Sequence, residues 1–380
     1  MTRDVLFSSP DLTCFVLDIP ASLENGQGGG RIRAAPALEL PYATPEPKGK
    51  KREAILAQIP QDELVYHAGV AAGVEEAAKV VARGLAARRW CLPRLLEPER
   101  HECVAPANHR RKSSSHIPMI LASGNNEFLN VHGIQHQVNV NGQNNSRIVV
   151  ADEISLLVPT DSSFIWAGVH DAYHIMKSYE EHADKPLKFD IMVMDPPWTN
   201  RSVRKSGYYS TKENQSSDPF LDALKIVQAF LTSDGCVAVW ITNKATVRRQ
   251  VTDELKRLDF VVSEEWIWTK ITTKGEPVTP LEGLWRKPYE ILLLFRRQVQ
   301  VSFPLRRFIF AVPDVHSRKP NLKTLFDRRF LPQRVLELFA RNLTKGWWSV
   351  GDEVIQYQDV RSWHIYDGSD FEQENPAKFI

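Results

Sequence analysis

The sequence predicts an α/β fold, in which a parallel sheet is covered by helices on both faces. Two observations support this prediction. First, the 380 residues of the chain are 43% hydrophobic and 25% charged, which is typical of a soluble globular chain that buries a sizeable core. From about residue 150 onward, short apolar runs alternate with longer segments of helical periodicity. Since ligands bind beyond the carboxyl ends of strands in such sheets, the residues that follow each strand are the first place to look for a site.

The alternating segments follow one another in a regular order. Apolar runs rich in β-branched and aromatic residues predict strands at 189–194, 236–241, 261–268, 291–295, 308–312 and 335–339. Segments with helical spacing predict helices at 220–231, 245–259 and 322–331. These nine elements define an expected catalytic domain over residues 151–380.

The first 150 residues change in composition several times, and we expect them to form an accessory region. Residues 21–52 combine a glycine cluster, four prolines and a basic run, a composition that buries little apolar surface, so a mobile linker is expected at about 21–52. The Ala-rich pattern of 53–90 predicts one or two amphipathic helices. The polar stretches 110–115 and 125–145 predict loops or weak hairpins.

Cysteine and apolar patterns limit the class of protein further. The four cysteines have no short-spaced framework, so free thiols in a reducing compartment are expected. The densest Cys and His group lacks the paired spacing of a tetrahedral zinc site, and no metal is expected there; its members are Cys91, His101, Cys103 and His109. The apolar run at 291–295 is far shorter than a bilayer-spanning helix, and the N-terminus lacks the pattern of a secretory signal.

The charge balance excludes nucleic-acid binding by bulk charge alone. The chain has 48 Lys and Arg against 46 Asp and Glu, a net charge of +2. A polynucleotide partner therefore requires local basic patches.

One tetrapeptide, Asp195-Pro196-Pro197-Trp198, directly follows the first predicted strand. Its two prolines fix φ and have no N–H, so we expect a stiff loop whose carbonyls stay free. The Asp195 carboxylate and the Pro196 carbonyl would each accept a hydrogen bond from one N–H group of an adenine amine. These two hydrogen bonds would hold the amine in place and favour localising its lone pair toward an electrophile. Trp198 would stack on the base, which must then be single-stranded or flipped out. The alternative interpretation is a rigid turn after a buried strand.

Several segments in a fixed order carry a resemblance to a known family. They are 195–198, Ser206-Gly-Tyr-Tyr209, Arg286-Lys-Pro-Tyr-Glu-Ile-Leu292, His316-Ser-Arg-Lys-Pro320, Leu336-Glu-Leu-Phe-Ala-Arg-Asn342 and Gly346-Trp-Trp-Ser349. With them, residues from about 150 to 360 resemble the MT-A70 family of adenine-N6 methyltransferases, and within it the methyltransferase-like four branch. The resemblance implies an enzyme with a Rossmann-like fold that uses S-adenosylmethionine.

The resemblance also implies a set of cofactor-binding residues: Asp190, Ile191, Asp195, Lys319, Glu337, Arg341, Asn342, Asp352 and Glu353. Lys319 precedes a proline, where a lysine is able to meet a carboxylate. The donor fork of Arg341 suits ribose hydroxyls or a carboxylate. Family members often have Asn where this chain has Asp352, which accepts hydrogen bonds but no longer donates them. The alternative for Lys319 is a solvated lysine in a basic loop. The alternative for Arg341 and Asn342 is a structural role at the end of a strand.

Two basic and aromatic groups are candidates for substrate binding, because such segments track a phosphate backbone while a base is splayed out. One follows the tetrapeptide and the other precedes the strand at 291–295; together they are Arg201, Arg204, Lys205, Tyr208, Tyr209, Lys212, Trp285, Arg286 and Lys287. The alternative is a solvated surface loop.

By resemblance, the expected substrate is adenine in RNA, namely the internal 2′-O-methyladenosine of the U2 spliceosomal small nuclear RNA. This implies a nuclear protein, with a cytoplasmic pool left open, and we expect it to act as a monomer. The alternatives are methylation of adenine in DNA, a catalytically weak RNA-binding scaffold of the same fold, and methylation of a small molecule or a protein amine.

Overall fold

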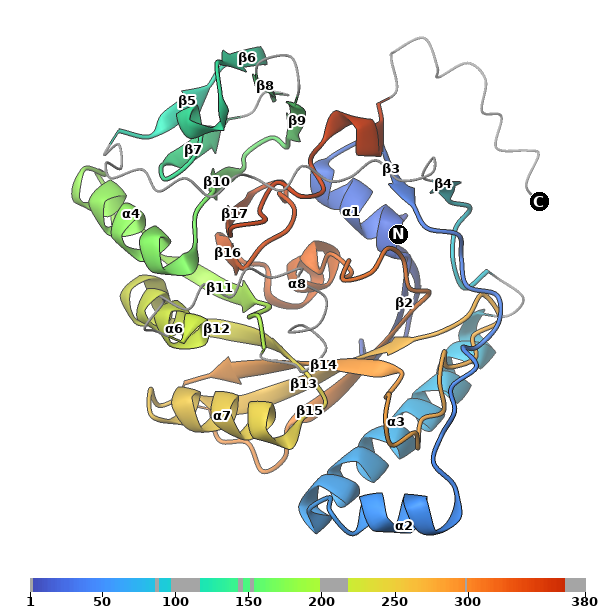
Figure 1. Ribbon diagram of the computed structural model, residues 1–380. Helices are drawn as coiled ribbons and strands as arrows, with labels where there is room; N and C mark the ends of the chain where they lie inside the picture. Colours follow the sequence, from blue (N-terminus) through green and yellow to red (C-terminus); the bar gives the residue numbers. More distant parts are fainter. Residues whose placement is uncertain are drawn as a thin grey trace.

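The computed structural model describes residues 3–85, 89–96, 117–142, 146–150, 154–198, 218–297 and 299–365. At its centre lies a twelve-stranded, mostly parallel sheet with the order β1-β2-β15-β13-β14-β12-β11-β16-β17-β10-β7-β5 (Figure 1). Its strands are β1 Val5–Ser8, β2 Cys14–Leu17, β5 Met119–Leu121, β7 Val138–Asn141, β10 Ser163–Ile165, β11 Phe189–Met194, β12 Leu231–Ile241, β13 Val261–Lys270, β14 Tyr289–Arg296, β15 Leu305–Ala311, β16 Val335–Leu338 and β17 Trp347–Val350.

Two small sheets flank the central one. The first has the order β18-β3-β4 and consists of β3 Arg31–Ala34, β4 Leu95–Leu96 and β18 Trp363–His364. The second has the order β6-β8-β9 and consists of β6 Gly124–Phe128, β8 Ser146–Val150 and β9 Ile154–Val158. The first joins segments that lie far apart in the sequence, whereas the second lies within residues 124–158.

Helices cover both faces of the central sheet. They are α1 Ile19–Gln27, α2 Gly49–Leu56, α3 Gln61–Leu85, α4 Val169–Glu181, α6 Pro219–Phe230, α7 Ala245–Lys256 and α8 Lys323–Phe330, with single 3₁₀ turns at Val131–Gly133 and Val360–Ser362. Apolar residues of α3, α4, α6 and α7 pack into the core of one face. Those of α1 and α8 pack into the core of the other. Among the described residues, no helix is long and apolar enough to cross a membrane.

The nine elements predicted between residues 189 and 339 are confirmed, with ends that differ by a few residues. The local signals are strong in this part of the chain. Helix α6, for example, begins with the capping residue Asp218 and Pro219 in its first turn, and buries Phe220, Val227 and Phe230 at helical spacing. Helix α4 and strand β17 were not predicted.

The expectation of a purely parallel sheet is wrong at β14. This strand pairs antiparallel with both β12 and β13, in register Ile241↔Ile291 and Ile267↔Ile291. The chain returns from β13 to β14 through residues 271–288 without a crossover helix, and only a crossover connection makes neighbouring strands parallel. As a result, the first residues of β14 lie at the edge where β12, β11 and β16 end.

The prediction of a mobile linker at 21–52 is also wrong for residues 21–34. Residues 19–27 form α1, whose N-cap Asp18 accepts a hydrogen bond from the Ala21 backbone N–H. The glycine cluster ends this helix, since Gly28 has a φ of +85°, a conformation that favours glycine. Residues 31–34 then form β3. A capped helix end, not a flexible tether, explains these glycines.

Strands from both sides of residue 150 build the central sheet, so the boundary expected at 150 does not divide it. Strand β2 pairs parallel with β15, and β7 pairs with β10. The helices expected within 53–90 are confirmed as the end of α2 and as α3. Part of the loop expected at 125–145 forms β6 and β7. The basic stretch 110–115 lies outside the described residues.

Candidate active site

The Asp195-Pro196-Pro197-Trp198 loop leaves the carboxyl end of β11, between β12 and β16. Asp195 is half-buried, Pro196 is buried and Pro197 is exposed. The expectation that both proline carbonyls stay free is wrong, because the Trp198 backbone N–H donates to the Pro196 carbonyl over 2.9 Å. A carbonyl oxygen has two lone pairs, so one acceptor position on Pro196 remains for a substrate amine.

Trp198 fixes the loop to its neighbours. Its indole N–H donates to the Trp240 carbonyl at the end of β12, over 2.9 Å. Its ring packs against Phe220 of α6, with 5.5 Å between ring centroids. This anchoring role was not predicted, and stacking of Trp198 on a base stays a prediction.

Asp195 lies between two cations from different loops. Its Oδ2 is 3.3 Å from Lys319 Nζ and 3.5 Å from Arg341 Nη1. Arg341 also binds Glu353 Oε2 through Nε at 2.9 Å and donates to the Ser317 carbonyl. The loops after β11, β15, β16 and β17 thus meet at one carboxylate. The predicted grouping of Asp195, Lys319, Arg341 and Glu353 is therefore present in the fold.

Lys319 has a second carboxylate partner, Glu290, which the sequence did not single out. Glu290 Oε2 lies 2.7 Å from Lys319 Nζ, and its Oε1 lies 2.6 Å from Lys270 Nζ. Burial by itself raises the pKa of Glu290, but Lys319 and Lys270 outweigh it and lower that pKa to about 2. The signal that marks Glu290 in the sequence is its place in the 286–292 segment, directly before an apolar strand.

The two lysines also face indole rings. Lys319 Nζ lies 5.1 Å from the ring centre of Trp240, and Lys270 Nζ lies 4.8 Å from that of Trp268. The two rings pack edge to face with centroids 6.0 Å apart. Cation–π contacts of this kind hold the ammonium groups in place and form one wall of the site.

Glu337 is a half-buried carboxylate on β16, in register with Val193 of β11. It makes no hydrogen bond or ion pair with the residues that the structure describes. Burial, together with the negative charge of Asp195, raises the pKa of Glu337 from 4.5 to about 7. A carboxylate held without a partner beside a cluster of charges is suited to bind a cationic group of a ligand.

This raised pKa predicts that Glu337→Gln stabilises the ligand-free protein at alkaline pH. The native state holds an extra proton on Glu337 between about pH 4.5 and 7, so stability falls as the pH rises through this window. We expect the variant to be more stable than the parent by about 3 kcal/mol at pH 8 and equal to it below pH 4.5. Urea unfolding at both pH values measures the difference. The exposed Glu282→Gln is the control, and a parent–variant difference that does not grow with pH contradicts the assignment.

The loops after β16 and β17 approach closely. A Cβ on Gly351 would lie 2.6 Å from the Ala340 carbonyl, so only glycine permits this contact. Phe339, which ends β16, has a φ of +59°, a strained conformation for a bulky residue. Strain of this kind is concentrated at functional sites, and Phe339 lies two residues before Arg341.

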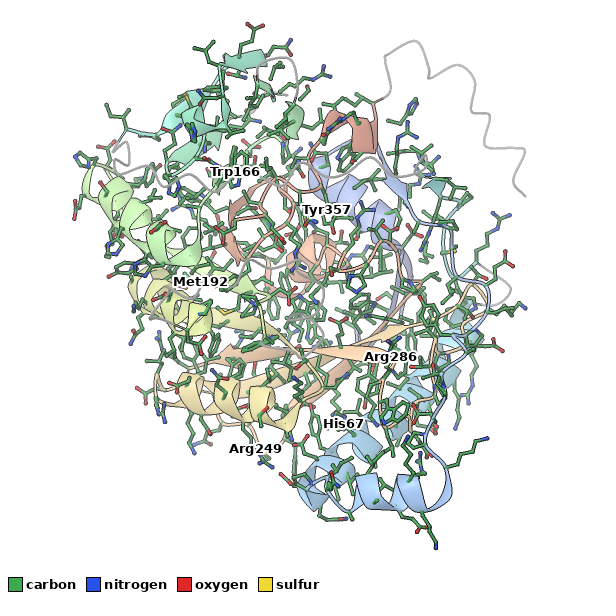
Figure 2. The ribbon with its side chains drawn as sticks, viewed as in Figure 1. His67, Trp166, Met192, Arg249, Arg286 and Tyr357 are labelled. Atoms are coloured by element: carbon green, nitrogen blue, oxygen red, sulfur yellow. The ribbon has the colours of Figure 1, made fainter. Side chains whose placement is uncertain are left out.

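Asn342 and Asp352 lie in these two loops. The Asn342 amide donates to Thr344 Oγ1 over 3.3 Å, within its own loop. The Asp352 side chain is exposed, and its backbone carbonyl accepts from the indole N–H of Trp166 (Figure 2). Their cofactor contacts stay predictions.

Asp190 and Ile191, two predicted cofactor-binding residues, lie away from the group around Asp195. Asp190 lies near the amino end of β11, about 16 Å along the strand from Asp195. Its carboxylate accepts from the backbone N–H groups of Gln333 and Arg334, and so fixes the turn before β16. Ile191 is 2% exposed and belongs to the core. The family resemblance implied the role, but strand β11 places these residues at its amino end, away from the end that carries Asp195.

The first group of predicted substrate-binding residues lies outside the described residues: Arg201, Arg204, Lys205, Tyr208, Tyr209 and Lys212. In the second group, Trp285 and Arg286 are exposed and Lys287 is half-buried, on the turn that leads into β14. Because β14 begins at the catalytic edge, this turn lies beside the site.

The residues present fit S-adenosylmethionine. This molecule has a carboxylate, an ammonium group, a sulfonium and ribose hydroxyls. Lys319 and Arg341 are placed to hold a carboxylate, Glu337 is placed to meet a cation, and Glu353 lies at the end of the next strand, where it is able to accept from hydroxyls. Among the described residues, no group of three or more His, Cys, Asp or Glu side chains could hold a metal ion.

A mostly parallel sheet with these charged side chains at the carboxyl ends of adjacent strands defines a Rossmann-like, S-adenosylmethionine-dependent methyltransferase. Residues 189–353 match the model of the MT-A70 family. The chain is 31% identical to the N6-methyladenosine RNA methyltransferase MTA1 of Cryphonectria parasitica, over 95% of this chain and 94% of that protein. The chain therefore belongs to the MT-A70 family of adenine-N6 methyltransferases.

Two further relatives match a smaller part of the chain. The N(6)-adenine-specific methyltransferase METTL4 of Homo sapiens is 35% identical over 54% of this chain and 44% of that protein. The DNA N6-methyl methyltransferase of Caenorhabditis elegans is 32% identical over 61% of each.

Proposed function

We propose that this protein transfers a methyl group to N6 of adenosine in RNA. The observation that carries the proposal is the geometry at the end of β11, where the Asp195 carboxylate is held by Lys319 and Arg341 beside the Pro196 carbonyl. The choice of RNA is supported by the relative named as an RNA methyltransferase, which matches almost the whole chain. The exposed Trp285 and Arg286 beside the site also fit a polynucleotide.

In the proposed mechanism, S-adenosylmethionine supplies the electrophilic methyl group when it is bound. Asp195 and the Pro196 carbonyl would each accept a hydrogen bond from one N–H group of the adenine amine, which would orient the nitrogen lone pair, and the Asp195 carboxylate would accept the proton that N6 loses when it gains the methyl group. Lys319 and Arg341 keep Asp195 in position, and Glu290 and Glu353 keep these two cations in position. Burial of the site limits competition from water for these hydrogen bonds.

The finer proposal rests on the resemblance to the methyltransferase-like four branch. It identifies the target as the internal 2′-O-methyladenosine of U2 small nuclear RNA, in a nuclear protein that acts as a monomer. Three oligonucleotides of one sequence test both levels: RNA, RNA with 2′-O-methyl on the target adenosine, and DNA. We expect transfer to RNA at least about tenfold faster than to DNA, measured as initial rates of N6-methyladenine formation by mass spectrometry.

The 2′-O-methyl RNA is expected to be the best of the three. Equal rates on both RNAs would contradict the proposal of a 2′-O-methyladenosine target, but not the proposal that the protein methylates adenosine in RNA. A faster rate on DNA would favour the alternative substrate, which the relative from Caenorhabditis elegans supports.

A second candidate is an RNA-binding scaffold without turnover. The intact tetrapeptide and the assembled charges around Asp195 speak against it. Isothermal titration of the folded protein with S-adenosylmethionine separates the two, since a scaffold without a cofactor site would give no binding heat.

A further inference from the structure

A basic and aromatic surface lies beside the catalytic edge, and its helical half lies outside residues 189–353, the part of the chain that matches the family model. It consists of α2 with the residues before it, and of the turn that leads into β14; we call it the α2 platform. Its charged and aromatic members are Glu46, Lys48, Lys50, Lys51, Arg52, Glu53, Glu282, Trp285, Arg286 and Lys287. Six cations against three carboxylates give it a larger positive excess than the +2 of the whole chain.

The two segments of the platform are joined by direct contacts. Lys51 Nζ lies 5.3 Å from the ring centre of Trp285, and the Glu46 carboxylate accepts from the Leu284 backbone N–H over 2.8 Å. Glu46 is thus turned inward, which removes part of the negative charge from the surface. Burial lowers the pKa of Lys287, and the positive charge of Arg52 lowers it further against the opposing effects of Glu46 and Glu282. Cations are therefore held together here in spite of their repulsion.

Helix stability does not explain these cations. Helix α2 contributes no buried residue to the core, its N-cap makes no side-chain hydrogen bond, and its first turn has no acidic residue. Lys50 and Lys51 lie instead in the first turn, where positive charge opposes the helix dipole and destabilises the helix. The exposed Trp285, at 50% of its full accessible area, does not contribute to a core either.

The platform adjoins the site. Lys287 is three residues before Glu290, about 10 Å of extended chain, and Glu290 is the carboxylate that holds Lys319. In Figure 2, Arg286 lies between the central sheet and the helices α2 and α3. A strand whose target base enters the site would therefore pass this surface with its neighbouring nucleotides.

We propose that the α2 platform binds single-stranded RNA next to the target adenosine, with Lys50, Lys51 and Arg286 on phosphates and Trp285 stacked on a base. This inference rests on the proposed function, from which it takes RNA as the ligand. It extends the contact surface from the turn at 282–287 to helix α2 in the N-terminal region, which lies outside the residues that match the family model.

The test compares Lys50→Gln/Lys51→Gln with Lys256→Gln/Arg257→Gln. The control pair lies at the end of α7, at the opposite edge of the sheet, and is equally exposed. Fluorescence anisotropy measures the binding of a labelled single-stranded RNA of about 20 nucleotides between about 50 and 200 mM salt. We expect the platform variant to weaken binding about tenfold and to reduce the slope of log Kd against log salt by about 1.4, since each lost phosphate contact on a single strand contributes about 0.7.

A second pair of variants tests stacking. Trp285→Ala is expected to weaken binding about tenfold without changing the salt slope, and Trp285→Phe to restore most of it, because it keeps an aromatic face. Unchanged thermal unfolding curves would show that the fold is intact. Binding and salt slopes equal to those of the α7 control would overturn the inference, even if RNA is methylated. If the platform variant reduces the salt slope but the protein methylates only DNA, the proposed RNA target is contradicted, whereas the α2 platform remains supported as a surface that binds nucleic acid.

Discussion

Asp195→Asn is expected to lower kcat by about 10³-fold while the protein remains folded. Asn has the same size, but it replaces one carboxylate oxygen by an NH₂ group, which donates where the adenine amine also donates. Where the NH₂ group replaces the carboxylate oxygen, two donors face each other, and the interaction between the side chain and the amine becomes repulsive. The measurement is single-turnover methylation of an RNA oligonucleotide at saturating S-adenosylmethionine.

The same substitution separates catalysis from cofactor binding. Lys319 and Arg341 lose their shared carboxylate in the variant but keep Glu290 and Glu353 as partners, so they stay in place for the carboxylate of the cofactor. We therefore expect calorimetry to give cofactor binding close to that of the parent. The exposed Pro197→Ala tests loop stiffness, with an expected loss that is much smaller. Turnover by Asp195→Asn at the parent rate would exclude the role assigned to Asp195.

The part of the site that the sequence predicts is the part encoded by local signals. Asp195, Lys319, Arg341 and Glu353 each follow a strand, and a parallel sheet gathers the ends of its strands at one edge. Asp190 shows the limit of this reasoning. It is five residues from Asp195, yet a strand separates the two by its whole length, so closeness in sequence means distance in the fold.

Glu290 and Lys270 were missed for the opposite reason. They come from the two ends of the 271–288 connection, and they meet because β14 turns back antiparallel to β13. No local sequence pattern predicts that β14 runs antiparallel to β13. An alternation of strands and helices predicts parallel neighbours, and only the absence of a helix between the two strands argues against them.

The N-terminal region was underestimated because several of its contacts reach the far end of the chain. Arg94 donates to the carbonyls of Val312 and Pro313, and Ala35 donates its N–H to Asp314. The buried Asp314 also binds Arg318, which is adjacent to Lys319. Residues before 100 therefore support the loop that carries a site lysine. Hydrogen bonds between such distant positions leave no periodicity to detect in the sequence.

Lys319→Met is expected to have the second large effect, because it leaves two carboxylates facing the gap. Lys319 is the common partner of Asp195 and Glu290, and its side chain is only 21% exposed. Without Lys319, Asp195 keeps only Arg341 and Glu290 keeps only Lys270 as partners, so we expect a loss of about 2 kcal/mol in the free energy of unfolding at pH 7. Urea unfolding measures this loss. Lys323→Met is the control, since its pair with Asp327 is more exposed and is expected to contribute less than about 1 kcal/mol.

The pH dependence of this loss identifies its cause. In the parent, the pKa of Glu290 is lowered to about 2, so the stability that this group contributes is present above its ordinary pKa of 4.5 and is lost as the pH falls toward 2. Without Lys319 this contribution shrinks, and the parent and variant should converge as the pH falls through that window. Lys319→Arg keeps the charge and should keep most of the stability, yet its planar fork does not reproduce the point contact of an ammonium with two carboxylates, so turnover should still fall. A parent–variant difference that is the same at pH 3 and pH 7 would show that Lys319 stabilises the fold by packing alone, and that its ion pairs with Glu290 and Asp195 do not hold the site together.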